Sequence, residues 1–264
     1  MTPRRAAAGR PDPGSRCDAD HHGGTARDRA GGSRGAGRLL LRGRRTSAAA
    51  ASGPERYGRL TEEQAARGSV TVDGLAPVQA DFRDSDAGGA KTAVVLSHQN
   101  GGTLCDRIPY LDAFAKAGYA VLPHTADGNG SDNIQQVAGY LRTKGIARLV
   151  RVGASKGGTG SIVAGSLPDL AMPPAAVVSL SSAESFGGDS ASSAVKRLAV
   201  PVLFAAEAGD RPFADDAHGL YDTAAAEDEQ LKIYPGADRG APLLSDGALP
   251  DVLAFLARTA PPQG

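Results

Sequence analysis

From about residue 92 onward, short apolar runs alternate with segments that carry apolar residues at helical spacing. The short runs predict a buried strand over 92–98 and further strands over 120–124, 148–153, 174–181, 200–207 and 231–236. The segments between them predict helices. In the first of these, for example, Ile108, Leu111, Phe114 and Ala115 share one face. Because strands and helices alternate strictly, we expect crossover connections and an α/β fold, a mostly parallel sheet covered by helices on both faces.

The chain before these strands has a different residue pattern. A capped helix is predicted to begin at Thr61, and residues 69–84 read as one or two strands around a turn. Residues 1–45 contain eleven Arg, no Lys and four Asp, with almost no periodic apolar positions. We therefore expect a disordered tail over residues 1–50 and one folded domain over 51–264. The Arg, Ala, Gly and Pro bias of the tail also fits a mis-assigned start of the gene.

Composition and charge exclude several classes of function. The 264 residues carry 29 basic and 29 acidic side chains, and no segment is apolar enough to span a membrane. The longest apolar run of the tail, Leu39–Leu41, is far shorter than the roughly 7–15 residues of a signal-peptide core, so we expect a cytoplasmic protein. Because basic residues do not interleave with aromatic ones, no nucleic-acid partner is expected. No HExxH or CxxC motif occurs, so we expect no metal or cofactor, and nothing indicates an obligate protein partner.

Ser155 lies between Gly153 and Gly157, just after the predicted strand 148–153 and just before a predicted helix. A serine between small residues at the carboxyl end of a central strand fits a strained strand-to-helix turn that exposes its hydroxyl. The backbone N–H of Lys156 would then lie at a helix N-terminus, where developing negative charge is stabilised. The pattern predicts that Ser155 is a nucleophile.

The same motif has two other interpretations. A serine before a glycine-rich helix can be an N-cap and nothing more. A phosphate-binding loop is excluded, because no Lys-Ser or Lys-Thr follows Gly158 and the G-x-G-x-x-G pattern does not match. The position on a central strand of an alternating series favours the nucleophile over the N-cap.

A second motif, HQNGG, follows the predicted strand 92–98 and occupies residues 98–102. Together with the Ser155 motif, it makes the chain resemble the α/β-hydrolase family, in particular the small lidless members that are similar to dienelactone hydrolase. The resemblance covers about residues 70–260. It implies an α/β-hydrolase fold and a site at the carboxyl ends of the strands.

The resemblance also assigns roles within the HQNGG motif. His98 matches the histidine that supports the oxyanion loop. The backbone N–H of Asn100 is implied as an oxyanion donor beside that of Lys156. Gln99 departs from the family, because glycine is usual at its position.

In the family, the triad acid follows the strand that corresponds to residues 200–207. Asp210, in the turn EAGDRPF, matches that place, with Glu207 as the alternative acid. Taken alone, Asp210 beside Gly209 would be an ordinary solvated turn carboxylate. The resemblance implies that it orients a base and stabilises the protonated form of that base.

The last motif of the family does not match. The resemblance implies a Gly-x-x-His-Gly loop after the final strand, but Arg239 stands at the histidine position, between Gly236 and Gly240. Arginine does not deprotonate in proteins and cannot act as a general base. We expect Arg239 to form an ion pair with Asp210 instead.

No other histidine is an evident substitute. The five are His21, His22, His98, His124 and His218. The first two lie in the predicted tail, and His218 falls in a helix outside the sheet. His124 ends a strand that the family places two strands from that of Ser155, roughly 10 Å away and too far for direct proton transfer. His98 is nearest, but its implied role is structural.

Two classes of function follow. The first is a carboxylesterase-like serine hydrolase that acts on small soluble acyl compounds through an acyl-Ser155 intermediate. The second is a catalytically impaired protein or binding module, because Arg239 replaces the triad histidine. About twenty residues separate the strands 174–181 and 200–207, enough for a short helix but not for a cap domain. We therefore expect an open, shallow site for a small molecule.

Overall fold

The structure, a computed structural model, describes residues 68–263 except residues 75, 126–129 and 171. The predicted tail and the helix predicted to begin at Thr61 lie outside the described residues. The strands are β1 (Ser69–Val72), β2 (Val78–Asp81), β3 (Thr92–Ser97), β4 (Ala120–Thr125), β5 (Arg148–Ala154), β6 (Pro174–Leu180), β7 (Ser185–Phe186), β8 (Asp189–Ser190), β9 (Val202–Glu207) and β10 (Glu229–Tyr234). The α-helices are α2 (Leu111–Lys116), α3 (Gly130–Thr143), α4 (Lys156–Gly165), α5 (Ala191–Ala194), α6 (Phe213–Asp222) and α7 (Leu249–Thr259). The remaining helical segments are η3 (Leu104–Tyr110), η4 (Val195–Arg197) and η5 (Leu244–Ala248).

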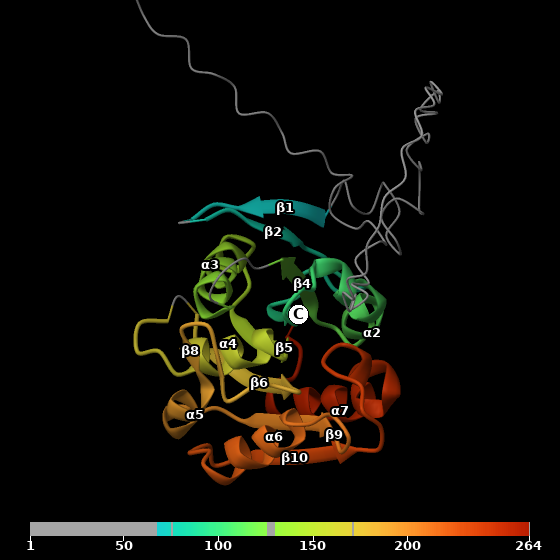
Figure 1. Ribbon diagram of the computed structural model, residues 1–264. Helices are drawn as coiled ribbons and strands as arrows, with labels where there is room; N and C mark the ends of the chain where they lie inside the picture. Colours follow the sequence, from blue (N-terminus) through green and yellow to red (C-terminus); the bar gives the residue numbers. More distant parts are fainter. Residues whose placement is uncertain (1–67, 75, 126–129, 171, 264) are drawn as a thin grey trace, which may run out of the picture.

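Eight of the strands form one sheet in the order β1-β2-β4-β3-β5-β6-β9-β10 (Figure 1). From β4 to β10 every neighbouring pair is parallel, whereas β1 and β2 form an antiparallel hairpin at one edge. The predicted mostly parallel sheet is therefore confirmed. In this order β5 is a central strand, and the carboxyl ends of β3, β5, β6 and β9 meet at one edge of the sheet.

Helices cover both faces of the sheet. On one face, η3, α2, η5 and α7 bury a core that includes Leu96, Val152 and Phe255. On the opposite face, α3 packs over β3 and β4, while α4, α5 and α6 pack over β6 and β9. The inner strands β3, β4, β5, β6 and β9 are buried from both sides, which explains why their sequences are almost continuously apolar. The edge strand β10 is only partly buried and carries polar residues.

The connection between β6 and β9 contains one element that the sequence did not predict. The expected short helix is present as α5 and η4, but it is preceded by the small hairpin of β7 and β8. Two-residue strands are too short for a periodic pattern, so the hairpin has no clear sequence signal. No cap domain occurs in this stretch, all of which the structure describes, as predicted.

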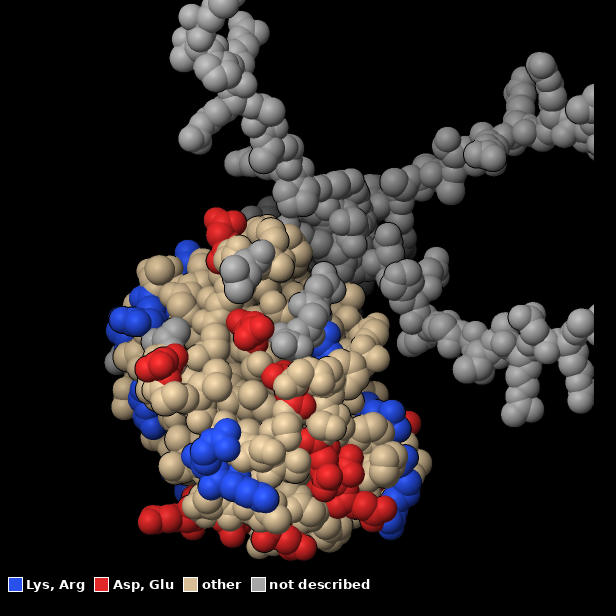
Figure 2. Space-filling view, turned by 60° about the vertical axis from the view of Figure 1, so that its left-hand side comes forward, with Lys and Arg blue, Asp and Glu red and all other residues tan. Residues whose placement is uncertain are grey.

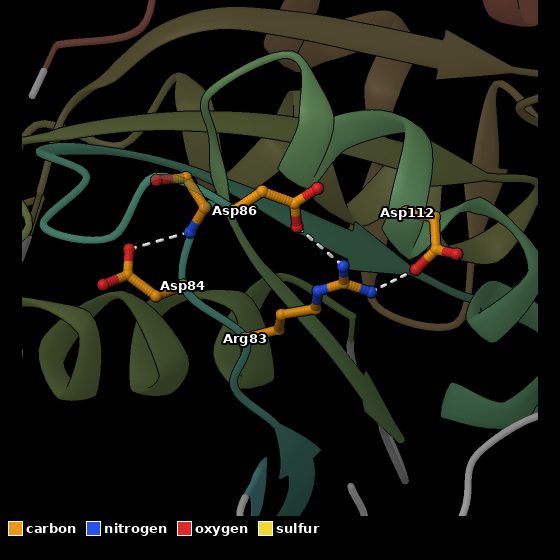
Figure 3. A network of polar contacts seen from close by, with 5 residues as sticks. Arg83, Asp84, Asp86 and Asp112 are labelled. Carbon is orange, nitrogen blue, oxygen red and sulfur yellow. Dashed lines mark hydrogen bonds and ion pairs between the residues drawn. The ribbon is translucent and has the colours of Figure 1, made fainter.

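A polar network joins the segment after β2 to α2 (Figure 3). The backbone of Arg83 pairs with that of Val121, through N–H···O bonds of 2.9 and 2.7 Å. Its guanidinium forms ion pairs with Asp86, at 2.8 Å, and with Asp112 of α2. Asp84 accepts bonds from the backbone N–H groups of the following turn. These contacts are at the surface and fix the chain path between β2 and β3.

The surface on the side of α3, β8 and α5 carries basic and acidic side chains side by side (Figure 2). Within the described residues, no helix is both long enough and apolar enough to cross a lipid bilayer.

Arg151 is an exception to the apolar pattern of β5. Its side chain is fully buried on the sheet, with Val95 and Val177 as its partners in the neighbouring strands. One nitrogen, Nη2, donates to Gln135 at 3.1 Å, but Nε and Nη1 have no hydrogen-bond partner. Burial lowers the pKa of this guanidinium to about 9. A buried cation with unsatisfied donors opposes folding.

We expect Arg151→Met to stabilise the domain, because it removes the two unsatisfied donors and keeps a long side chain. The free energy of unfolding should rise by about 1–3 kcal/mol at pH 7. The pKa of Arg151 in the folded state lies below its ordinary value, so burial of the charged guanidinium destabilises the folded chain. This free-energy cost is fully present below pH 9 and declines as the pH rises above it. Chemical denaturation at pH 7 and pH 10 measures both effects. Arg148→Met in the same strand is the control and should change stability by less than about 0.5 kcal/mol; an equal or lower stability of Arg151→Met would contradict this account.

Candidate functional site

Ser155 is placed by a sharp turn between β5 and α4. Its backbone has φ 49° and ψ −118°, and Ser155 and Ser181 are the two non-glycine residues of the described chain with positive φ. Such a conformation costs on the order of 1–3 kcal/mol and persists only where the surroundings enforce it. Only 7 % of the surface of Ser155 is exposed, yet its side chain makes no hydrogen bond that caps α4. The N-cap interpretation of this serine therefore fails.

Two glycines enforce the turn. A Cβ atom at Gly153 would lie 2.2 Å from the carbonyl oxygen of Gly157. A Cβ atom at Gly157 would lie 2.7 Å from the carbonyl oxygens of Ser97 and His98, at the end of the adjacent strand β3. Because these are backbone atoms, they cannot move aside. The first turn of α4 thus packs directly on β3 and β5, and this contact presents Ser155 at the carboxyl edge of the sheet.

The two residues implied as oxyanion donors flank this turn. Lys156 is the first residue of α4, so its backbone N–H lies at the positive end of the helix dipole. Asn100 is exposed in the turn directly after β3, whose last residue, Ser97, pairs with Gly153 of β5. Both residues are therefore at the same edge of the sheet as Ser155.

Arg107 of η3 stabilises the turn after β3, and the sequence analysis did not identify it. It is fully buried, and its Nη2 donates to the carbonyl oxygen of Ser97 at 2.9 Å and to Oε1 of Gln99 at 3.1 Å. Burial lowers its pKa to about 10. A signal was present: Arg107 falls four residues before Leu111 and seven before Phe114, on the apolar face of the predicted helix.

His98 supports the same turn. Its Nδ1 lies 2.6 Å from the carbonyl oxygen of Gln99, an atom that only accepts, so Nδ1 carries the proton. Burial lowers the pKa of His98, and the positive charges of Lys156 and Arg107 lower it further. The ring is therefore neutral at neutral pH and orders the loop that carries Asn100.

The other two described histidines lie on β4 and α6. His124 is fully buried on β4, two strands from β5, and its Nε2 lies 2.9 Å from the hydroxyl of Ser97. Burial, with smaller contributions from the nearby His98, Arg107 and Lys156, lowers its pKa to about 3. His218 is exposed on α6.

Asp210 and Arg239 form the expected ion pair. Nε of Arg239 donates to Oδ1 of Asp210 at 3.0 Å, and the guanidinium carbon lies 3.8 Å from the centre of the Phe213 ring. The Asp210 side chain is 2 % exposed, whereas that of Arg239 is 47 % exposed. The second oxygen, Oδ2 of Asp210, is buried without a hydrogen-bond partner. Phe213, which clamps the guanidinium, is a contact that the sequence did not reveal.

Glu207, the alternative acid, binds the backbone of the final loop and not the side chain of Arg239. Its Oε2 accepts the backbone N–H of Asp238 at 2.6 Å, so it holds the backbone of the loop that carries Arg239. Gly236 lies directly over this carboxylate: a Cβ atom there would come within 2.1 Å of Oε2. Asp210 is therefore the carboxylate that meets the side chain of Arg239.

The loop that carries Arg239 is fixed at several points. The N–H of Gly209 donates to the carbonyl oxygen of Gly236 at 2.8 Å, and the Tyr110 hydroxyl donates to that of Ala241 at 2.8 Å. A Cβ atom at Gly240 would lie 3.3 Å from Cβ of Ala154, the residue before Ser155. The loop thus lies against the turn of Ser155, and Arg239 is held beside it.

Comparison with known proteins identifies the fold. No protein-family model and no curated protein sequence matches the chain. A dienelactone hydrolase from Anabaena variabilis is 19% identical with a TM-score of 0.56, over 72% of this chain and 94% of that protein. An esterase from Pyrococcus furiosus is 14% identical with a TM-score of 0.60, over 72% of this chain and 90% of that protein. An enol-lactonase from Burkholderia xenovorans is 15% identical with a TM-score of 0.58, over 71% of this chain and 99% of that protein. The chain has the α/β-hydrolase fold, as the resemblance implied.

The tight packing of α4 predicts opposite effects for the same substitution at two helical glycines. Gly157→Ala places a methyl group against two backbone carbonyls and should lower the free energy of unfolding by about 2 kcal/mol. Gly139→Ala in α3 is the matched control, because a Cβ atom there meets nothing within 4 Å. It should raise stability by up to about 1 kcal/mol. Denaturant titration measures the free energy of unfolding of both variants. An unchanged free energy of unfolding in Gly157→Ala would show that the turn is not tight.

Proposed function

We propose that the chain is a serine hydrolase that acts on small soluble acyl compounds through an acyl-Ser155 intermediate. The observation that carries the proposal is the strained backbone of Ser155 at the carboxyl edge of the sheet, since backbone strain of this kind clusters at active sites. In this proposal the hydroxyl of Ser155 attacks the acyl carbon, and the leaving group departs with the hydroxyl proton.

The proposed oxyanion donors are the backbone N–H groups of Lys156 and Asn100. Lys156 begins α4, and Asn100 lies in the turn that His98 and Arg107 hold. Such preorganised donors stabilise the negative charge that develops on the acyl oxygen, which is commonly the largest single contribution to catalysis. A site of this kind needs no cofactor.

The weakness of the proposed site is proton transfer. Asp210 has the position of a triad acid, but its partner is a guanidinium that cannot accept a proton. We therefore expect slow turnover of the unmodified chain. The connection between β6 and β9 holds no cap domain, which suits a small substrate.

The Asp210–Arg239 ion pair favours a second candidate, a hydrolase-fold protein that has lost catalysis and binds a small molecule. A fluorophosphonate probe separates the two. Stoichiometric labelling of Ser155 in the folded, unmodified protein, and none in Ser155→Ala, would support the hydrolase. Absence of labelling would favour the binding protein.

We expect Arg239→His to create the absent base. The loop is already fixed next to Ser155, and Asp210 can accept the Nδ1–H of an imidazole where it now accepts the Nε–H of Arg239. Hydrolysis of a small activated ester should rise by about 10²–10⁴-fold, the usual contribution of a general base.

Two controls make this result specific. The gain should vanish in the double variant Arg239→His with Ser155→Ala, because it depends on the serine as nucleophile. Arg239→Gln removes the cation without supplying a base and should show no comparable gain. A folded Arg239→His variant that is no faster than the parent would mean that the loop does not direct residue 239 at Ser155.

A further inference from the structure

Arg239 cannot serve as a base, but its guanidinium is positioned to bind an anionic ligand. Its Nε donates to a buried carboxylate and its guanidinium carbon lies over the Phe213 ring, so two contacts restrain the guanidinium. Among the described residues, no acceptor meets its terminal nitrogens Nη1 and Nη2, and about half of the side chain is exposed. A fixed guanidinium with a free edge is the geometry that binds planar oxyanions through two parallel hydrogen bonds.

Other dipolar and charged groups lie around Ser155. The amino end of α4, a helix of ten residues, lies next to the loop of Arg239 and favours a negative charge there. The charges of Lys156 and Arg107 lower the pKa of His98 at the same edge of the sheet, whereas the charge of Asp106 raises it. The residue Ser155 is 93 % buried, and its hydroxyl makes no capping hydrogen bond to α4. The hydroxyl is a further donor for a ligand that lies between these groups.

We propose that the unmodified site binds the free carboxylate of a small organic acid, between the terminal nitrogens of Arg239 and the amino end of α4. A neutral imidazole at position 239 would favour an uncharged ester at this place. A cation there favours a ligand that carries a full negative charge. The ligand uses the site of the proposed hydrolase, but its binding requires no acyl transfer.

Small carboxylates fit better than larger anions on two grounds. The guanidinium edge matches a planar carboxylate through two contacts. The connection between β6 and β9 supplies no cap domain, so the site offers little further surface to a large ligand. Butyrate is therefore a suitable probe, with butyramide as the uncharged compound of the same shape.

Titration calorimetry of the full chain in a carboxylate-free, low-salt buffer tests the proposal. Butyrate should bind at least ten-fold more tightly than butyramide. Arg239→Gln should weaken butyrate binding at least ten-fold and leave butyramide unaffected. Arg211→Gln is the matched control, because Arg211 also forms an ion pair with an aspartate, Asp215, but is exposed on the protein surface. It should bind butyrate as the parent does.

Several outcomes would overturn the proposal. Equal affinity for butyrate and butyramide, or equal butyrate affinity in Arg239→Gln and the parent, would show that no carboxylate site exists. Tighter binding of inorganic phosphate than of butyrate would show that the carboxylate assignment is wrong. Should Arg239→Gln fail to fold, the butyrate-induced shift of the Arg239 Nε–H resonance in the unmodified chain decides the question, and an unmoved resonance contradicts the proposal.

This test is independent of the proposed hydrolase activity. Butyrate does not react with Ser155, so failure of binding leaves the result of fluorophosphonate labelling unaffected. Conversely, an unlabelled serine does not lower the expected affinity for butyrate.

Discussion

The close approach of α4 to the carboxyl ends of β3 and β5 is the constraint on which the site depends. It is possible only because Gly157 has no Cβ atom, which would lie 2.7 Å from two backbone carbonyl oxygens. This contact forces Ser155 into a left-handed backbone conformation and brings the turn that carries Asn100 to the same edge of the sheet. Strain at Ser155 is tolerated because the surrounding strands are buried on both faces and cannot yield.

The chemistry of the site is then set by one substitution relative to the family pattern. Asp210, Glu207 and Tyr110 hold the final loop and its side chain as a catalytic loop would be held, but the side chain is Arg239. The guanidinium satisfies one oxygen of the buried carboxylate, and about half of its side chain is exposed. The same framework that would orient a base therefore orients a cation, and both the proposed slow hydrolysis and the proposed carboxylate binding follow from this change.

Much of this could be predicted from the sequence. Alternating apolar runs predicted the parallel sheet, and the spacing of Gly153, Ser155 and Gly157 predicted the turn, because close packing requires small residues at fixed positions. The pairing of Asp210 with Arg239 was implied by the resemblance to the α/β-hydrolase family, which places the two residues at the positions of the triad acid and the triad histidine. The hairpin of β7 and β8 was missed since two-residue strands have no period. The contacts of Phe213 and Arg107 were missed because they depend on side-chain directions in the folded chain.

The central claim is that the framework around Ser155 is complete except for a base. A crystal structure of the Arg239→His variant tests it most directly. The account predicts an imidazole with Nδ1 on Asp210 and Nε2 within about 2.6–3.2 Å of the Ser155 hydroxyl, without movement of the loop. An imidazole that points to solvent, or a loop that has moved away from Ala154, would contradict it.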